Sequence, residues 1–339
     1  GATMYPLRER FPKGAGRVPA TLALVLAVLL NSSPCDGSGE TFSRRTTYRI
    51  SGSGWGGQRS VRLASTSVLD HSRACVPEET WADMDIDAFL EPDSVDSLVR
   101  SGLECAGMDG VGPVVWSPDK NTAKLLEGET GDPAEWRRTL EDEVLVWTGK
   151  FRPGCYGAAL PVIRSRGIVG MSPRDLTELI MDSARVRLYN KMSLGRDDVR
   201  VVQTGVDTVC PDTGRRGETK VVRNRTKPPL TKKTLDFVTM MHARRMEAAE
   251  GGGYVLVSRA IGGDVDGDGD VDEDDARLVR SEIMLGINVM RPVPGFEDKC
   301  ELTAVTHVNS PLTPMMVAQK LGKKGAADFL KDVRAACGQ

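Results

Sequence analysis

The amino-acid sequence predicts an α+β fold in which an antiparallel sheet packs against a long C-terminal helix. Strand-like runs recur through the last hundred residues, at Leu235–Met246, Tyr254–Ile261, Glu282–Val293 and Cys300–Asn309. Glycines 251–253 supply a flexible hairpin connection between the first two runs. Beyond the strands, apolar and small residues repeat every three or four positions, which predicts a helix with one face packed on apolar surface.

The C-terminal helix has a recognisable start and an unusual composition. Thr313 and Pro314 fit a helix N-terminus, because a hydroxyl caps free N–H groups and proline suits the first helical position. The stripe comprises Met315, Ala318, Gly322, Ala326, Phe329, Val333 and Cys337. Glycine lowers helix propensity by about 1 kcal/mol relative to alanine. Gly322 therefore indicates either a close approach of backbones or a mobile helix.

The elements before this block alternate between strands and one helix. Strands are expected at Val144–Phe151, Ala158–Val169, Val199–Thr204 and Thr219–Thr226. Between the second and third, Ser172 and Pro173 open a helix of about 16 residues that ends near Asn190. Its apolar residues recur at helical spacing, which predicts a buried face.

The N-terminal third divides into three segments by composition. Residues 1–35 contain basic residues, the apolar run Ala20–Leu30 and a small polar end, the pattern of a secretory signal peptide. The run is about a dozen residues long, and crossing a bilayer takes roughly 20. Residues 36–75 are rich in Arg and Ser, as in a transit peptide or a disordered linker. Residues 76–142 form an acidic lead-in that includes a helix-compatible piece, Pro92–Leu103.

These segments predict that the chain enters the secretory pathway. A signal peptide followed by a transit-like segment resembles the two-part plastid address of algae with secondary plastids. The alternative destinations are the endomembrane system and the exterior of the cell.

Composition bounds the class of protein. The chain has 339 residues, 40% of them hydrophobic and 27% charged, which suits a globular domain of about 143–339 with extra segments. A net charge of −2 does not predict a nucleic-acid partner. Seven cysteines form no C-x-x-C pair, and there are only three histidines and no G-x-S-x-G or Walker motif. We therefore expect a monomeric binding protein that is not an enzyme and requires no cofactor.

Five stretches, in order, match one family. They are 172–190 (SPRDLTELIMDSARVRLYN), 236–238 (DFV), 254–259 (YVLVSR), 300–309 and 326–330 (AADFL). Together they resemble the START domain, the steroidogenic acute regulatory-type lipid-transfer module. The resemblance implies a helix-grip (START/Bet v 1-like) fold, in which a curved sheet wraps the final helix around a tunnel that holds one lipid. Peripheral contact with a membrane is implied as well.

The same resemblance implies a set of ligand-facing residues. These are Phe237, Thr239 and Met241 on one strand, Tyr254, Leu256 and Ser258 on the next, and Phe329, Val333 and Cys337 on the final helix. The buried Glu and Arg of sterol-binding members fall at Val222 and Met241 here. Because that polar pair is missing at these positions, the ligand is expected to be more apolar than a sterol.

An acidic loop interrupts the sheet within the insertion 262–280. Asp264, Asp266, Asp268, Asp270 and Asp275 occupy positions 1, 3, 5, 7 and 12 of a calcium loop. Position 12 is Asp rather than Glu, as in dockerin-type loops, and a strand precedes the loop where an EF-hand has a helix. The loop is either a Ca²⁺ site or a solvated insertion.

Three functions remain open from the sequence. The first is a lipid carrier or sensor, whose basic stretch 215–245 faces an anionic membrane or simply solvent. The second is a calcium-dependent interaction module that acts through residues 264–275. The third is an enzyme on a helix-grip fold, such as a cyclase, which would need polar groups inside the tunnel.

Overall fold

The computed structural model describes residues 87, 90–107, 112–151, 159–228, 232–261, 278–312 and 315–338. All of them belong to one compact unit, Leu63–Gln339. The predicted segments 1–35 and 36–75 lie outside the described residues, as does the acidic loop with Asp264, Asp266, Asp268, Asp270 and Asp275.

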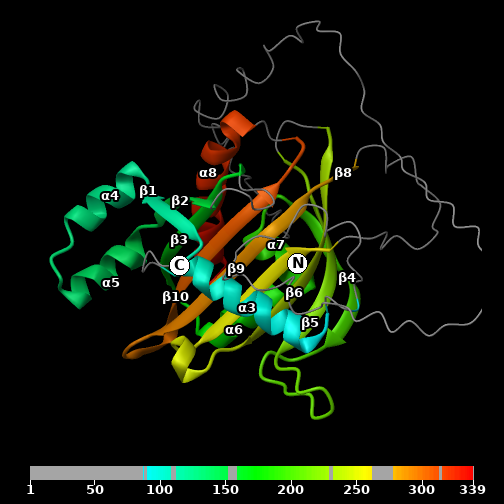
Figure 1. The fold of residues 1–339 in the computed structure, drawn as a ribbon. Helices are drawn as coiled ribbons and strands as arrows, with labels where there is room; N and C mark the ends of the chain where they lie inside the picture. Colours follow the sequence, from blue (N-terminus) through cyan, green and yellow to red (C-terminus); the bar gives the residue numbers. More distant parts are fainter. Residues whose placement is uncertain are drawn as a thin grey trace, which may run out of the picture. The chain divides into compact units, whose positions relative to one another are not determined.

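Figure 1 shows a large sheet with helices on both of its faces. The helices are α3 (Pro92–Ala106), α4 (Lys120–Glu127), α5 (Pro133–Asp142), α6 (Pro173–Met181), α7 (Val186–Tyr189) and α8 (Met315–Ala336), with short 3-10 turns η3 (Ser183–Arg185) and η4 (Ala248–Glu250). The strands are β1 (Val114–Pro118), β2 (Leu145–Phe151), β3 (Val162–Val169), β4 (Ser193–Gln203), β5 (Glu218–Thr226), β6 (Thr234–Arg245), β7 (Tyr254–Ala260), β8 (Leu278–Arg280), β9 (Glu282–Val293) and β10 (Phe296–Asn309).

The strands form one sheet in the order β1-β2-β3-β10-β9-β7-β6-β5-β4. Neighbours on this path pair antiparallel, and β8 adds a short parallel contact to β6. The antiparallel sheet and the long C-terminal helix confirm the predicted α+β, helix-grip fold class.

The hairpin between β6 and β7 turns where the glycines predict it. Gly251, Gly252 and Gly253 all have positive φ, at 96°, 68° and 84°. A side chain at Gly253 would also overlap the carbonyl of Met290 on β9. Both the backbone conformation and the close approach therefore require glycine there.

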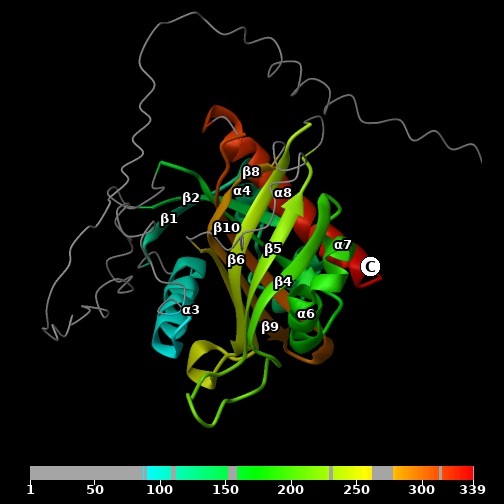
Figure 2. The same cartoon turned by 90° about the vertical axis from the view of Figure 1, so that its right-hand side faces the viewer.

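The two faces of the sheet have different covers. We call the face toward α6, α7 and α8 the inner face, and the face toward α3 the outer face (Figure 2). Alternate residues of each strand supply the two cores. On the inner face, Met241, Leu256 and Leu302 cluster with residues of α6 and α8. On the outer face, Met240 and Val257 cluster with residues of α3.

On the outer face, α3 is fixed near both ends. The guanidinium of Arg164, on β3, lies between the rings of Trp116 and Trp147, at 4.8 and 4.2 Å from their centroids. It also donates to the carbonyl oxygen of Gly107, just after α3, at 3.2 Å. Near the start of α3, Asp96 lies 3.8 Å from Arg244 of β6. Burial lowers the pKa of Arg164 to about 10.

On the inner face, α8 lies close to β3. A Cβ atom added to Gly322 would come within 2.9 Å of the Ile163 side chain, so Gly322 allows the close approach that its position in the stripe predicted. Further along, Arg334 donates to the carbonyl oxygens of Leu140 at 2.6 Å and Ile168 at 2.9 Å. The C-terminal half of α8 is therefore hydrogen-bonded to the β2–β3 end of the sheet.

Three elements differ from the prediction. The helix after Ser172 ends at Met181 instead of continuing to Asn190, because the Asp182 side chain accepts from the N–H of Ala184 and starts a separate turn. The strand expected at 199–204 begins earlier, at Ser193. The sheet also extends beyond the predicted domain start at residue 143, since β1 pairs with β2.

No helix within the described ranges is long and apolar enough to cross a membrane.

A buried histidine on the outer face makes stability depend on pH. His242 is 1% exposed, and its Nδ1 lies 2.9 Å from the Thr219 hydroxyl. Burial, with help from the nearby charges of Arg244 and Arg215, lowers its pKa from 6.5 to about 3. The folded state therefore excludes a proton that the unfolded chain binds below pH 6.5.

We expect the free energy of unfolding to fall as the pH drops from 6.5 toward 3, by up to about 1.4 kcal/mol per pH unit from this one group. Denaturant unfolding between pH 7 and 5 measures the slope. His242→Gln should remove most of it. Equal slopes in His242→Gln and the unsubstituted protein would show that His242 is not the group responsible.

Candidate functional site

The predicted ligand-facing strand residues all lie on the inner face. Met241, Tyr254 and Leu256 belong to its core cluster, and strand alternation puts Phe237, Thr239 and Ser258 on the same side. All six are buried, and Met241 pairs directly with Ser258 across β6 and β7. The structure therefore places all six predicted residues on one face of the sheet, the face that α6 and α8 cover.

These residues divide between two ends of the inner face. Tyr254 and Leu256 pack with α6 and α8, and the Tyr254 hydroxyl donates to Asp207 at 2.8 Å. Val333 is fully buried in the same cluster, and Cys337 packs against it. This end is filled by the protein's own side chains, so the structure gives these four residues a packing role.

Phe329 lies one turn before Val333 on α8 and packs against the same core cluster, but it is only partly buried. Its ring meets Tyr189 of α7 edge-on, with 6.3 Å between centroids and 81° between planes. The Tyr189 hydroxyl donates to the carbonyl oxygen of Ile180 at 2.9 Å. Through this contact, α8 touches a polar network that the sequence analysis did not predict.

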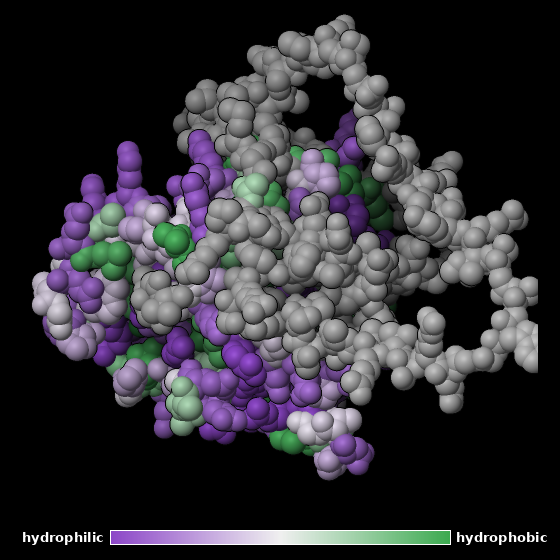
Figure 3. Space-filling view, viewed as in Figure 1, coloured by the Kyte–Doolittle hydropathy of each residue, from purple (hydrophilic) through white to green (hydrophobic). Residues whose placement is uncertain are grey.

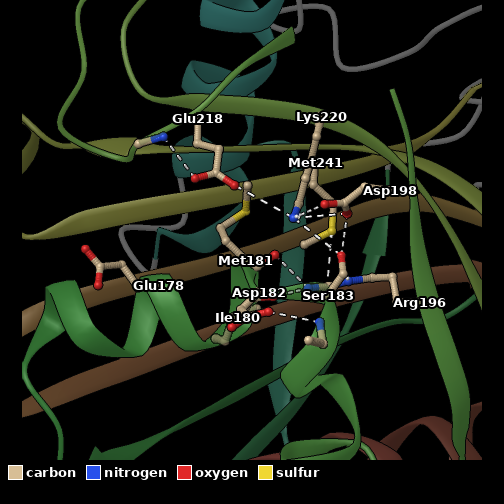
Figure 4. A network of polar contacts seen from close by, with 12 residues as sticks. Glu178, Ile180, Met181, Asp182, Ser183, Arg196, Asp198, Glu218, Lys220 and Met241 are labelled. Atoms are coloured by element: carbon tan, nitrogen blue, oxygen red, sulfur yellow. Dashed lines mark hydrogen bonds and ion pairs between the residues drawn. The ribbon is translucent and has the colours of Figure 1, made fainter. Parts of the chain in front are cut away.

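Figure 4 shows that network, which is centred on Arg196 of β4. One guanidinium nitrogen of Arg196 donates to the carbonyl oxygens of Ile180 and Met181, both at 2.8 Å. Another donates to the Tyr189 hydroxyl at 3.2 Å, and Nε donates to Ser183 at 3.0 Å. The carbonyls at the end of a helix have no partner within the helix. Arg196 supplies those partners where α6 ends.

A buried lysine of β5 completes the network. The Lys220 side chain is 5% exposed, and its Nζ lies 3.1 Å from Asp198 and 3.8 Å from Glu218. With Arg196, the network holds two cations and two carboxylates. A buried charge is tolerated when it is paired and hydrogen-bonded, as these are. We call Arg196, Asp198, Glu218 and Lys220 the charged network.

We expected the polar pair of sterol-binding members to be missing, and the charges that the structure places nearby were not predicted. Val222 and Met241, where sterol-binding members carry charged groups, are indeed apolar and buried. Lys220, however, lies directly opposite Met241 on β5, with the rest of the charged network beside it. The sequence does contain a sign of this network. Glu218 and Lys220 on β5 are two residues apart, as are Arg196 and Asp198 on β4, and alternate strand residues share a face.

The basic stretch 215–245 does not form one basic surface. Lys220 and Arg244 are each 4% exposed. Arg244 donates to Glu250 at 2.7 Å, and Arg223 donates to Asp236 at 2.9 Å. Several of the predicted membrane-facing cations are therefore used inside the fold.

Two thiols lie in the inner-face core. Cys300 is buried in it, and Cys337 is packed against it. Burial raises the pKa of both thiols, so both are protonated at neutral pH. In the described part of the chain, no three His, Cys, Asp or Glu side chains gather in a way that could hold a metal ion.

Comparison with known proteins gives structural likenesses only. No family model matches the sequence, and no curated protein matches it. The lipid transfer and protein localization domain of human StarD13 is 13% identical over 62% of this chain and 95% of that one, with a TM-score of 0.45. Human StAR-related lipid transfer protein 5 is 17% identical over 65% and 97%, with a TM-score of 0.44.

A STAR-related lipid transfer protein from Xanthomonas axonopodis is 13% identical over 66% of this chain and 99% of that one, with a TM-score of 0.44. Likenesses at these identities and scores do not identify a ligand for this chain.

The charged network predicts a large effect for Arg196. We expect Arg196→Met to lower the free energy of unfolding by about 2–4 kcal/mol, because it leaves the Ile180 and Met181 carbonyls without their donor. Arg200→Met is the matched control, since Arg200 is on the same strand but exposed. Its effect should stay below about 0.5 kcal/mol. Urea unfolding measures both, and equal stabilities would show that Arg196 does not hold the end of α6.

Proposed function

We propose that this chain binds a single hydrophobic lipid between the inner face and α8, and carries or senses it at membranes as a monomer. The observation that carries the proposal is an exposed residue on the inner face, near the end of β10. Thr306 of β10 is exposed, although its neighbours Val305 and His307 are buried. Side chains therefore do not fill the space above it.

The contacts of the helices leave this area uncovered. α8 contacts β2, β3 and β10, whereas α6 contacts β6, β7, β9 and β10 through its packed core. Gly286 of β9 lies beside Thr306 and contributes no side chain. An acyl chain that entered this area would meet apolar groups such as Met241 and Met284, which are 6% and 5% exposed. Burial of apolar surface favours such a ligand.

The proposal assigns no reaction to the chain. The inner-face thiols are held protonated by burial, Lys220 is paired with Asp198, and Arg196 donates to backbone carbonyls. A transport role requires only binding and release.

A surface patch supports contact with an anionic membrane. Leu188, Met192 and Leu194, around the connection from α7 to β4, are 55%, 48% and 44% exposed. Lys191 is adjacent in sequence, and the N–H of Lys227 donates to the Met192 carbonyl. Exposed apolar residues beside cations favour an anionic bilayer. On the face in Figure 3, by contrast, hydrophobic residues occupy only small separate areas of a mostly hydrophilic described surface.

Filling the uncovered space should reduce lipid uptake. We expect Phe329→Trp to lower the amount of co-purified lipid by at least about twofold, because the larger ring takes volume from the ligand. Native mass spectrometry of the full chain measures bound lipid. Phe296→Trp is the control, because Phe296 packs outside the inner-face core, under Arg137 and Lys299. If the unsubstituted protein carries no lipid after incubation with vesicles, the proposed function is wrong.

Placing negative charge in the surface patch should weaken membrane contact. We expect Met192→Glu/Leu194→Glu to reduce sedimentation with phosphatidylserine vesicles by about tenfold at 0.1 M salt. Val115→Glu is the control, at a valine of β1 that is 68% exposed. Equal loss in both variants would mean that the vesicles respond to net charge and not to this patch.

A further inference from the structure

The inner face carries uncharged polar side chains gathered around Gly286, where the pairing of β7 with β9 ends. Ser258 of β7 and Thr306 of β10 pair with Gly286 from its two sides. Asn288 follows two residues later on β9 and therefore shares the face. Thr239 of β6 lies diagonally from Ser258, because Thr239 pairs with Ala260. We call these five residues the uncharged patch.

The hydrogen-bonding groups of the uncharged patch are unused by the protein. Thr239 is 2% exposed, yet its hydroxyl has no hydrogen-bond partner. Within the described ranges, the side chains of Ser258, Asn288 and Thr306 also make no hydrogen bond. A buried hydroxyl without a partner is costly in a folded protein. Thr239 therefore points to a partner that the chain itself does not supply.

The protein's own side chains close the patch on one side of Gly286 only. A Cβ atom at Gly286 would overlap the Ser258 hydroxyl, so the Ser258 side chain leans over the glycine. On the other side of Gly286, Thr306 is exposed. Hydroxyl and amide groups thus surround an area of sheet that has no side chain of its own.

No unpaired charge of the charged network reaches this patch. Its nearest member along the paired row is Lys220, and the Met241 side chain lies between Lys220 and Ser258. The Lys220 ammonium is already held by Asp198 and Glu218. The guanidinium of Arg196 is likewise held by backbone carbonyls. An anionic group placed at Gly286 would lose its water without gaining a free cation, which is costly.

We infer that the uncharged patch binds the polar end of an uncharged lipid, one whose head is a hydroxyl, an ester or an amide and not a phosphate. This inference rests on the proposed function. Hydroxyls both donate and accept, and the Asn288 amide offers two donors and an acceptor, so the patch satisfies such a head from several sides.

Two lipids that differ only in the head test the inference. The full chain is incubated with phosphatidylcholine vesicles that contain equal amounts of dioleoylglycerol and dioleoylphosphatidic acid. Native mass spectrometry then identifies the bound lipid. We expect dioleoylglycerol to exceed dioleoylphosphatidic acid by at least about tenfold, because the acyl chains are identical and only the phosphate must be desolvated.

Isosteric variants locate the site. Thr239→Val and Asn288→Leu should each weaken dioleoylglycerol binding about three- to tenfold, as expected for one lost hydrogen bond. Thr303→Val is the matched control, since Thr303 is buried on the outer face of β10 and should bind dioleoylglycerol like the unsubstituted protein. Thermal melting of each variant shows that it is folded.

The outcomes separate the inference from the proposed function. Bound phosphatidic acid or phosphatidylcholine in preference to dioleoylglycerol would overturn the inference and leave lipid binding standing. Preferred dioleoylglycerol with undiminished binding in both folded patch variants would overturn the assignment of the head to this patch. If no lipid is bound under any condition, the proposed function and the inference both fall.

Discussion

The fold depends on the burial of its central strands on both faces. β7 is buried at every residue from Tyr254 to Ala260, and alternate residues of one strand point to opposite sides of a sheet. A sheet of this kind is stable only when each face has an apolar cover. The inner face receives α6 and α8, and the outer face receives α3. This requirement explains why the acidic lead-in, with α3 and β1, belongs to the folded unit.

Each cover is fixed by an arginine as well as by apolar contact. Arg164 holds the C-terminal end of α3 through backbone carbonyls and two tryptophan rings. Arg196 holds the end of α6, and Arg334 holds α8. A planar guanidinium with five donors suits this task, because helix ends and connections present several carbonyl oxygens at once. Apolar packing selects the face, and these arginines define where each cover ends.

The central strands were predictable, whereas the site between them was only partly so. Runs such as Tyr254–Ile261 are mostly apolar and follow a glycine-rich turn, so their limits follow from composition. The start of β4 is polar and contains Gly195 and Asp197, so its sequence does not show the pattern of a strand. Its pairing with β5 also shifts register three times. Those shifts bring Arg196, Lys220 and Asp198 together. The spacing of these residues along the chain does not by itself predict that they meet.

The inner face has two polar sites, the charged network and the uncharged patch. In the charged network, each cation meets an oxygen within the protein, so the network stabilises the fold without offering a charge to a ligand. In the uncharged patch, Thr239 is buried without a partner, and the Ser258 side chain lies over Gly286. The charged network already holds the surrounding strands in register. The fold can therefore tolerate polar groups without partners in the uncharged patch. The proposed preference for an uncharged head rests on this difference between the two polar sites.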